Sequence, residues 1–284
     1  MAPKLFDTHA HVNFKAFQDD SADVLQSCLK ERIWVNNIGS QYETSKRAVE
    51  LAEKYPEGVY ATVGLHPIHL SEQEVDEEEV RFKTREEEFD PDVYRKLAQN
   101  PKVVAIGECG LEYYRLPEGL EDEAKKNQEK AFRLQIELAI DAKKALMVHS
   151  RDAYEAIFEI LKEYQSRLPA VIIHSFIGSW EQARKFLDIG CYISYNGIIT
   201  YKPRKEKKPG QSDPELLQAV KNTPLDRILL ETDSPYLSPE PLRGQRNVPQ
   251  NVKYVAQKLA EIKKVDMEEI ERQTAKNAKA VFSI

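Results

Sequence analysis

Residues 5–11 read Leu-Phe-Asp-Thr-His-Ala-His, a short apolar run that ends in two histidines. The same arrangement recurs along the chain, because all six histidines come after apolar runs: His9, His11, His66, His69, His149 and His174. Two carboxylates share this placement, Glu108 at the end of VVAIGE and Asp233 at the end of ILLETD. Imidazole and carboxylate groups gathered from separate strand ends suit a divalent metal site with open coordination positions. The sequence therefore predicts a metal-dependent hydrolase.

The apolar runs predict eight β-strands, at about 4–10, 32–38, 58–65, 103–108, 145–149, 170–174, 191–195 and 228–233. Most are continuously apolar, as expected of strands that are covered on both faces. Segments with helical periodicity lie between them, at about 19–31, 42–55, 90–99, 128–143, 152–166, 179–189, 213–222, 249–263 and 266–281. Eight strands alternating with helices predict one distorted (β/α)8 TIM barrel over residues 1–284, with no linker that divides it. An open doubly wound sheet is the alternative fold.

A barrel would bring the polar strand ends together, because the loops that follow its strands converge on one face. His9 and His11 are two residues apart and therefore project to the same side of the first strand. Glu231 projects to the same side of its strand as Asp233 but lies two residues earlier. We therefore expect it to contact a metal ligand and not the metal ion itself. Asp7 has the parity of the two histidines, and it either orients an imidazole or ties strand ends together.

The polar residues are sufficient for two divalent ions. His9, His11 and Asp233 would hold one ion, His149 and His174 would hold the other, and Glu108 would bridge them. Two neighbouring ions activate a water and polarise the bond to be cleaved, and Asp233 is the candidate to orient or deprotonate that water. Imidazole-rich ligation favours zinc or manganese, whereas phosphodiester chemistry in cells often uses magnesium, so all three metals stay candidates.

The composition is that of a soluble intracellular enzyme. With 41% hydrophobic residues the 284-residue chain has enough apolar surface for a substantial core. No run approaches the roughly 20 apolar residues that cross a bilayer, and the N-terminus shows no leader pattern. We expect a cytoplasmic location, or a nuclear one if the source is eukaryotic. Cys28, Cys109 and Cys191 are widely spaced without a CxxC pair, which predicts buried thiols.

The net charge of −6 is confined to one stretch. Residues 72–88 contain nine acids and three bases, which leaves 38 acids and 38 bases in the rest of the chain. Such a run predicts a solvated helix or loop and says little about the substrate.

The ordered motifs identify a family resemblance. FDTHAH, VGLHP, AIGECGLEYY, QEKAFRLQIELA, MVHSRDA, IIHSF and LLETDSPYLSP extend over essentially the whole chain. Together they resemble the TatD family of metal-dependent deoxyribonucleases, a branch of the amidohydrolase-like barrels. The resemblance implies that His9, His11, Glu108, His149, His174 and Asp233 are metal-site residues. It also implies that the reaction is phosphodiester hydrolysis in DNA, by an exonuclease that removes nucleotides from DNA ends.

The chain departs from the family pattern at three places. Glu112 stands in GLEYY where the family usually has Asp, so its hydrogen bonds must reach differently. The family's frequent HPH is HPIH here, which keeps His66 in register and displaces His69 by one residue. In PLRGQRNVP, Val248 replaces the acid of the family's RGxxNEP.

Several residues are candidates for substrate contact, each with a structural alternative. His66 would contact phosphate or a third metal ion, and Arg151 would either hold a phosphate oxygen or form a salt bridge at the start of a helix. Tyr113 and Tyr114 would either stack on a terminal base or pack a loop. Arg246, with Arg243 and Asn247, would contact phosphate or brace the last loop. Lys205 belongs to a basic stretch, residues 202–208, that is either a solvated loop or a guide for DNA.

Three functions follow from these observations. The first is a metal-dependent deoxyribonuclease whose partner is DNA, with no membrane and no obligate protein partner. The second is an amide, ester or lactone hydrolase on the same barrel. Related binuclear barrels often have a carbamylated lysine where this chain has Glu108, which favours the nuclease. The third is a binding protein that has lost catalysis.

Overall fold

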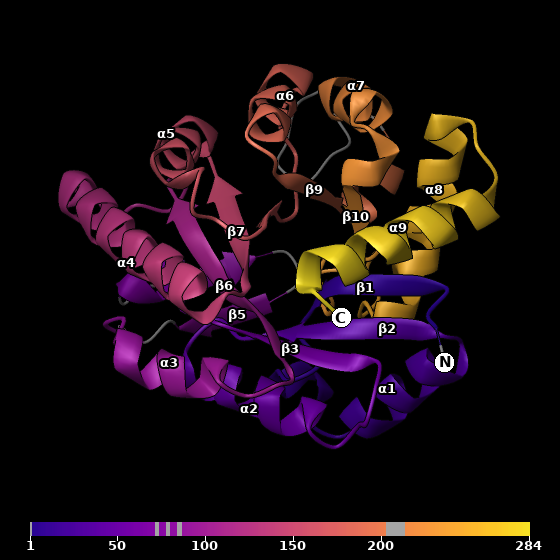
Figure 1. Ribbon diagram of the computed structural model, residues 1–284, viewed down its shortest axis with the longest axis horizontal. Coiled ribbons are helices and arrows are strands. Elements are labelled where there is room, and N and C mark those ends of the chain that lie inside the picture. Colours follow the sequence, from indigo (N-terminus) through magenta and orange to yellow (C-terminus); the bar gives the residue numbers. More distant parts are fainter. Residues whose placement is uncertain (1, 72–73, 78–79, 84–86, 203–213) are drawn as a thin grey trace.

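The computed structural model describes residues 2–71, 74–77, 80–83, 87–202 and 214–284. Eight parallel strands form one sheet in the order β1-β2-β3-β6-β7-β8-β9-β10 (Figure 1). Their bounds are β1 (Leu5–Ala10), β2 (Ile33–Ile38), β3 (Val59–Val63), β6 (Val103–Glu112), β7 (Ala145–Arg151), β8 (Val171–Ile173), β9 (Tyr192–Tyr195) and β10 (Ile228–Leu230).

The sheet closes on itself where β1 meets the chain that follows β10. The backbone N–H of His11 donates to the carbonyl of Ser234 at 2.7 Å, and the N–H of Asp233 donates to the carbonyl of His9 at 2.9 Å. Ala10 and Ser234 also form a parallel bridge. These bonds confirm the predicted (β/α)8 barrel and exclude the open doubly wound sheet, which has two free edges.

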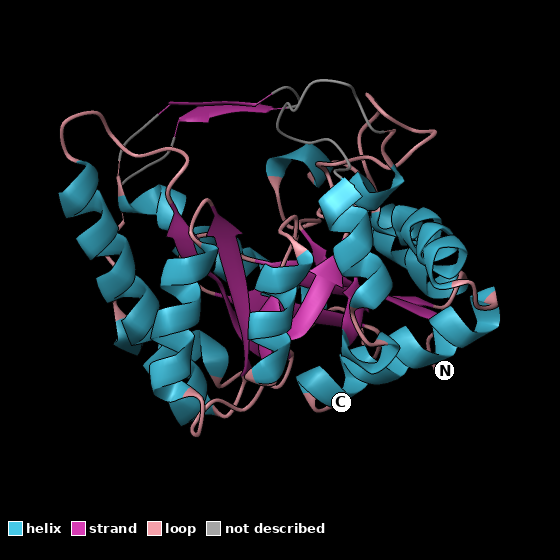
Figure 2. Ribbon diagram, turned by 90° about the horizontal axis from the view of Figure 1, so that it is seen from above, coloured by secondary structure: helices cyan, strands magenta, loops and turns pink. Residues whose placement is uncertain are grey.

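Helices surround the strands, as Figure 2 shows from above. They are α1 (Ser21–Lys30), α2 (Tyr42–Ala52), α3 (Pro91–Ala98), α4 (Glu121–Ala142), α5 (Tyr154–Tyr164), α6 (Trp180–Asp188), α7 (Pro214–Asn222), α8 (Val252–Lys263) and α9 (Met267–Phe282). Short 3-10 helices are η1 (Lys15–Phe17), η2 (Pro67–Leu70), η3 (Gly197–Thr200), η4 (Leu225–Arg227) and η5 (Pro249–Asn251). None of the helices in the described part of the chain is long and apolar enough to cross a membrane.

The core has two parts, one between the strands and the helices and one inside the barrel. Inside, Phe6 packs with Trp34 and Tyr60 near the beginning of their strands. Phe282, at the end of α9, lies 5.5 Å from Phe6 between ring centroids. The amino-terminal end of the barrel is therefore filled with apolar side chains, which leaves the opposite end for polar ones. The three cysteines are buried free thiols, as predicted.

Two sequence predictions need correction. The acidic stretch holds an antiparallel hairpin, β4 (Glu74–Glu77) and β5 (Val80–Lys83), where we expected a helix or loop without strands. The alternation of apolar and charged residues in VRFK is a strand pattern that the charge count conceals. Helix α4 begins at Glu121, about seven residues before its apolar face becomes regular, because its first turns are charged and carry no periodic signal.

Candidate metal centre

Glu108, on β6, lies at the centre of the polar cluster. Its Oε2 is 3.3 Å from Nε2 of His9, and its Oε1 is 2.9 Å from Nδ1 of His149 and 3.5 Å from Nε2 of His174. The carboxylate is 6% exposed. The barrel thus brings together residues from β1, β6, β7 and the end of β8, although β6 continues four residues beyond Glu108, where we expected it to end. Each oxygen of Glu108 faces a different set of histidines.

The first set consists of His9, His11 and Asp233. Nε2 of His9 lies 3.2 Å from Nε2 of His11, and Oδ1 of Asp233 lies 3.3 Å from Nε2 of His11. Nδ1 of His11 is 3.0 Å from the carbonyl of Ile38, which only accepts, so the ring proton is on Nδ1 and Nε2 keeps its lone pair. Donor atoms around tetrahedral zinc are about 3.3 Å apart. The spacing and the lone pair fit a cation.

The second set consists of His149 and His174, and each presents one ring nitrogen to Glu108. The other nitrogen of each faces a second carboxylate: Nε2 of His149 is 3.3 Å from Oε2 of Glu112, and Nδ1 of His174 is 2.9 Å from Oε1 of Glu231. A carboxylate behind a histidine fixes its tautomer and orientation, which is the usual arrangement at metal sites. Glu112, which is one methylene longer than the Asp usual in the family, therefore places its carboxylate against His149.

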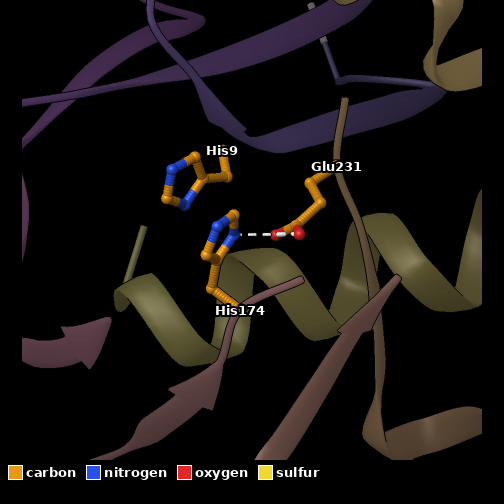
Figure 3. Close-up of side chains that lie close together, drawn as sticks. All are labelled: His9, His174 and Glu231. Atoms are coloured by element: carbon orange, nitrogen blue, oxygen red, sulfur yellow. Dashed lines mark ion pairs between the residues drawn. The ribbon is translucent and has the colours of Figure 1, made fainter. Parts of the chain in front are cut away.

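Glu231 has both oxygens occupied by donors. Oε1 accepts from the backbone N–H of Ser175 at 2.7 Å, and Oε2 accepts from Oγ of Ser194 at 2.6 Å. Figure 3 shows the ring of His174 between Glu231 and the stacked ring of His9, whose centroid is 3.5 Å away. Glu231 thus lies behind a histidine, as its parity with Asp233 led us to expect.

His66 and His69 differ in what they face. Nδ1 of His66 accepts a hydrogen bond from the N–H of Ile68 at 3.1 Å, so its proton is on Nε2, which points at Glu108 from 3.4 Å. In this tautomer His66 is a hydrogen-bond donor toward the cluster. His69 is buried beside Ser40, 3.3 Å from its hydroxyl, and burial lowers the pKa of His69 to about 3. His69 is accordingly a neutral structural residue.

The carboxylates control the charge of the second set. Burial alone would lower the pKa of His149, but hydrogen bonds to Glu108 and Glu112 outweigh it and raise the pKa to about 9. Burial is likewise outweighed at His174, where Glu231 and Glu108 raise the pKa to about 10. Burial would raise the pKa of Glu108, yet the surrounding histidines hold it well below its ordinary value. The metal-free centre therefore pairs imidazolium rings with ionised carboxylates.

Asp233 is placed by the closing turn of the barrel. Its φ of +59° is left-handed, a conformation that Asp tolerates better than most residues. Burial would raise the pKa of this carboxyl, but the neighbouring imidazoles of His11, His174 and His9 outweigh it and lower the pKa. Its side chain is 15% exposed, compared with 6% for Glu108. Asp233 is thus ionised and reachable by water.

Arg151 and the two tyrosines occupy the rim next to the cluster. The guanidinium of Arg151 lies 4.3 Å from the ring centroid of Tyr114, which is 50% exposed. Tyr113 packs against the core, with Nζ of Lys125 at 5.1 Å from its ring centroid. Arg115 lies 5.5 Å from the ring centroid of Tyr114, so this exposed ring has two guanidinium groups beside it.

Residues of the last loop brace the barrel. Arg246 forms an ion pair with Asp20 and donates to the carbonyl of Ala16 at 2.7 Å, so its guanidinium is not directed at the metal centre. Asn247 donates to the carbonyls of Thr232 and Tyr236. The bracing role is the alternative that the geometry supports for both.

Other predicted residues have structural partners or fall outside the described chain. Arg243 lies 3.9 Å from the ring centroid of Tyr201. Asp7 accepts from the N–H and the hydroxyl of Thr232, and so ties strand ends together. Lys205 and the basic residues after Lys202 lie outside the described residues.

Two supporting groups were not foreseen from the sequence. Ser194 holds Glu231, and the carbonyl of Ile38 fixes the tautomer of His11. No sequence pattern marks these two groups. They can be recognised only when β9 and β2 have been placed beside the strands that carry the ligands.

Comparison with known proteins agrees with this geometry. The family described as TatD related DNase matches residues 6–283. This chain belongs to the TatD-related DNase family. The TatD-family chain is 37% identical over 281 residues to the metal-dependent hydrolase YabD of Bacillus subtilis (strain 168), with 99% of each protein covered. It is 30% identical over 285 residues to a protein of Erwinia tasmaniensis named 3′-5′ ssDNA/RNA exonuclease TatD, with 99% of this chain and 100% of that protein covered.

A solved structure shares the TatD fold. The TatD homologue YjjV of Escherichia coli K12 superposes with a TM-score of 0.80 at 28% identity, and the match covers 100% of both chains. The family resemblance is therefore confirmed, and the protein is a metal-dependent hydrolase of the TatD family with buried His and Glu groups suited to metal ions.

Proposed function

We propose that this protein is a metal-dependent deoxyribonuclease that acts as an exonuclease. The observation that carries the proposal is the position of Glu108, with one oxygen toward His9 and the other toward His149 and His174. His9, His11, Asp233 and Glu108 would hold one ion, and His149, His174 and Glu108 would hold a second. The relative named 3′-5′ ssDNA/RNA exonuclease TatD supports a nucleic-acid substrate.

Divalent ions held by these residues would polarise a phosphoryl group and lower the pKa of an attacking water. Asp233 accepts the proton of that water, since it is ionised and is the more exposed of the two carboxylates in the centre. Its Oδ1 lies 3.3 Å from Nε2 of His11, so the carboxylate and the lone pair of that imidazole face the same position.

His66 and Arg151 hold the phosphate. The Nε2–H of His66 faces the cluster and donates to a phosphate oxygen, a role that its tautomer favours over that of a third metal ligand. Arg151, two residues after His149, supplies positive charge on the same side of β7. The exposed ring of Tyr114 beside Arg151 offers a stacking surface to a base, whereas Tyr113 packs against the core.

The test is digestion of end-labelled single- and double-stranded DNA by metal-stripped protein resupplied with magnesium, manganese or zinc. We expect a ladder that shortens from one end and that depends on added metal. Glu108→Ala should lower kcat/KM by more than about a hundredfold, because loss of a mere outer partner of a metal ligand costs 10–100-fold. Glu268→Ala, an exposed glutamate of α9, is the matched control and should retain full activity.

One result would contradict the nuclease proposal. If the protein binds metal ions but cleaves neither DNA nor RNA, the same centre serves another ester or amide, and small esters and lactones become the substrates to screen.

A further inference from the structure

A cleft of about 590 Å³ lies on the rim of the barrel beside the second histidine set. It is formed by the loops that follow β7 and β8 and by the first turns of α5, α6 and α7, and its lining includes Tyr113, Ser150, Ile177 and Glu215. Ser150 directly follows His149, and Ile177 is three residues after His174. Pockets for small ligands range from about 300 to 1,000 Å³, so one nucleotide fits this volume.

The N-terminus of α5 opens into this rim cleft without a cap. Its N-cap residue, Ala153, has no side chain that accepts a hydrogen bond. The backbone N–H groups of Tyr154, Glu155 and Ala156 find no acceptor in the part of the chain that the structure describes, and all three residues line the cleft. Helix α6, in contrast, is closed by a capping box between Ser179 and Gln182. Free N–H groups at a helix N-terminus bind anions.

Ser150 is an independent sign of a ligand. It is 7% exposed, and its Oγ has no hydrogen-bond partner among the residues that the structure describes. Because side chains alternate along a strand, Ser150 projects away from the side of His149 and Arg151 and lines the cleft. A buried hydroxyl without a partner is unfavourable, and an acceptor such as a phosphate oxygen would satisfy it.

The remaining walls suit a nucleoside. Ile177 is 45% exposed and gives the cleft an apolar surface, and Tyr113 also lines it. Of the acidic residues in the lining, Glu155 is paired with Lys185 at 2.7 Å. The carboxylate of Asp152 can accept hydrogen bonds from base amino groups or sugar hydroxyls. The anion site at α5 and these walls together match one phosphate with its sugar and base.

We propose that the rim cleft binds the nucleotide next to the one whose phosphate is cleaved, with that neighbour's phosphate against Ser150 and the start of α5. This inference rests on the proposed nuclease function and adds a second contact with the strand. It follows that a trinucleotide, which has two phosphodiesters, binds more tightly than a dinucleotide, which has one.

The experiment measures binding without turnover. Fluorescence anisotropy of a labelled single-stranded oligodeoxynucleotide is followed with metal-free protein, and unlabelled trinucleotide, dinucleotide and inorganic phosphate compete. Ser150→Ala should weaken binding about tenfold, the loss expected for one hydrogen bond to a charged group. Ile177→Glu should bind about tenfold more weakly than its neutral partner Ile177→Gln, because the two differ only in a charge beside the anion site.

The outcomes separate the cleft from the nuclease. Equal binding by Ile177→Glu and Ile177→Gln, with wild-type binding by Ser150→Ala, would overturn the assignment even if the protein digests DNA. Inorganic phosphate that competes as well as the trinucleotide would also overturn it. If Ile177→Glu loses binding but the wild-type protein with metal cleaves neither DNA nor RNA, the result supports nucleotide binding in the cleft and contradicts the nuclease function. Thermal unfolding followed by circular dichroism confirms that each variant is folded.

Discussion

At the scale of single residues, the second histidine set couples metal binding to protons. The pKa values of His149 and His174, about 9 and about 10, mean that both rings are charged near neutral pH in the metal-free protein. Both values lie above the ordinary value of 6.5. The stabilisation from their ion pairs is therefore complete below about pH 6.5 and is lost as the pH rises through 9 and 10.

We predict that a divalent ion displaces these protons. A ligating imidazole is neutral, so binding near neutral pH should release roughly two protons, and the apparent affinity should rise with pH until about pH 10. Titration calorimetry in buffers of different ionisation enthalpy measures the release. Glu231→Gln removes the charge behind His174 and should reduce the release toward one proton. Heat that does not depend on the buffer would contradict the assignment of these histidines as ligands.

The positions of the site residues were largely predictable from the sequence. Histidines and carboxylates that end apolar runs do converge, because parallel strand ends share one face of a barrel. Arg246 does not follow that rule, since its partner Asp20 lies 226 residues earlier and is exposed. A surface ion pair of this kind leaves no pattern in the sequence.

At the scale of elements, apolar runs identified all eight barrel strands because those strands are buried from both sides. The elements that were missed or shortened, β4, β5 and the first turns of α4, are rich in charge. Their conformation depends on backbone pairing and on neighbouring helices, so hydrophobic periodicity carries no information about them.

Helix α9 provides the prediction at this scale. Phe282 is 4% exposed and packs on Phe6 at the amino-terminal end of the barrel. Phe282→Ala should lower the free energy of unfolding by about 3–5 kcal/mol, as expected for a truncated core phenylalanine. Metal affinity should not change, because this end is opposite the metal centre. Urea denaturation measures the first quantity and titration calorimetry the second. Ile284→Ala, at a side chain that is 36% exposed, is the control.

At the scale of the whole molecule, closure of the barrel and assembly of the metal centre depend on the same contacts. Strand β1 and the segment after β10 are joined through His11 with Ser234 and through Asp233 with the carbonyl of His9, so three of these residues also belong to the first set. Deeper in the barrel, Asp7 accepts from the N–H of Thr232 at 2.9 Å and from its hydroxyl at 2.5 Å. A loss of closure should therefore separate His9 and His11 from Asp233.

Asp7→Ala tests this coupling between fold and site. It leaves the buried N–H and hydroxyl of Thr232 without an acceptor, which should cost about 2–3 kcal/mol of unfolding free energy. Metal affinity should fall about tenfold although Asp7 touches no imidazole ring, because the histidines and Asp233 are held by the same two strand ends. Asp7→Asn keeps one acceptor, so its losses of unfolding free energy and metal affinity should be smaller. Asp226→Ala, on exposed η4, is the control and should change neither quantity. If Asp7→Ala unfolds more easily but binds metal with wild-type affinity, the centre is assembled independently of barrel closure.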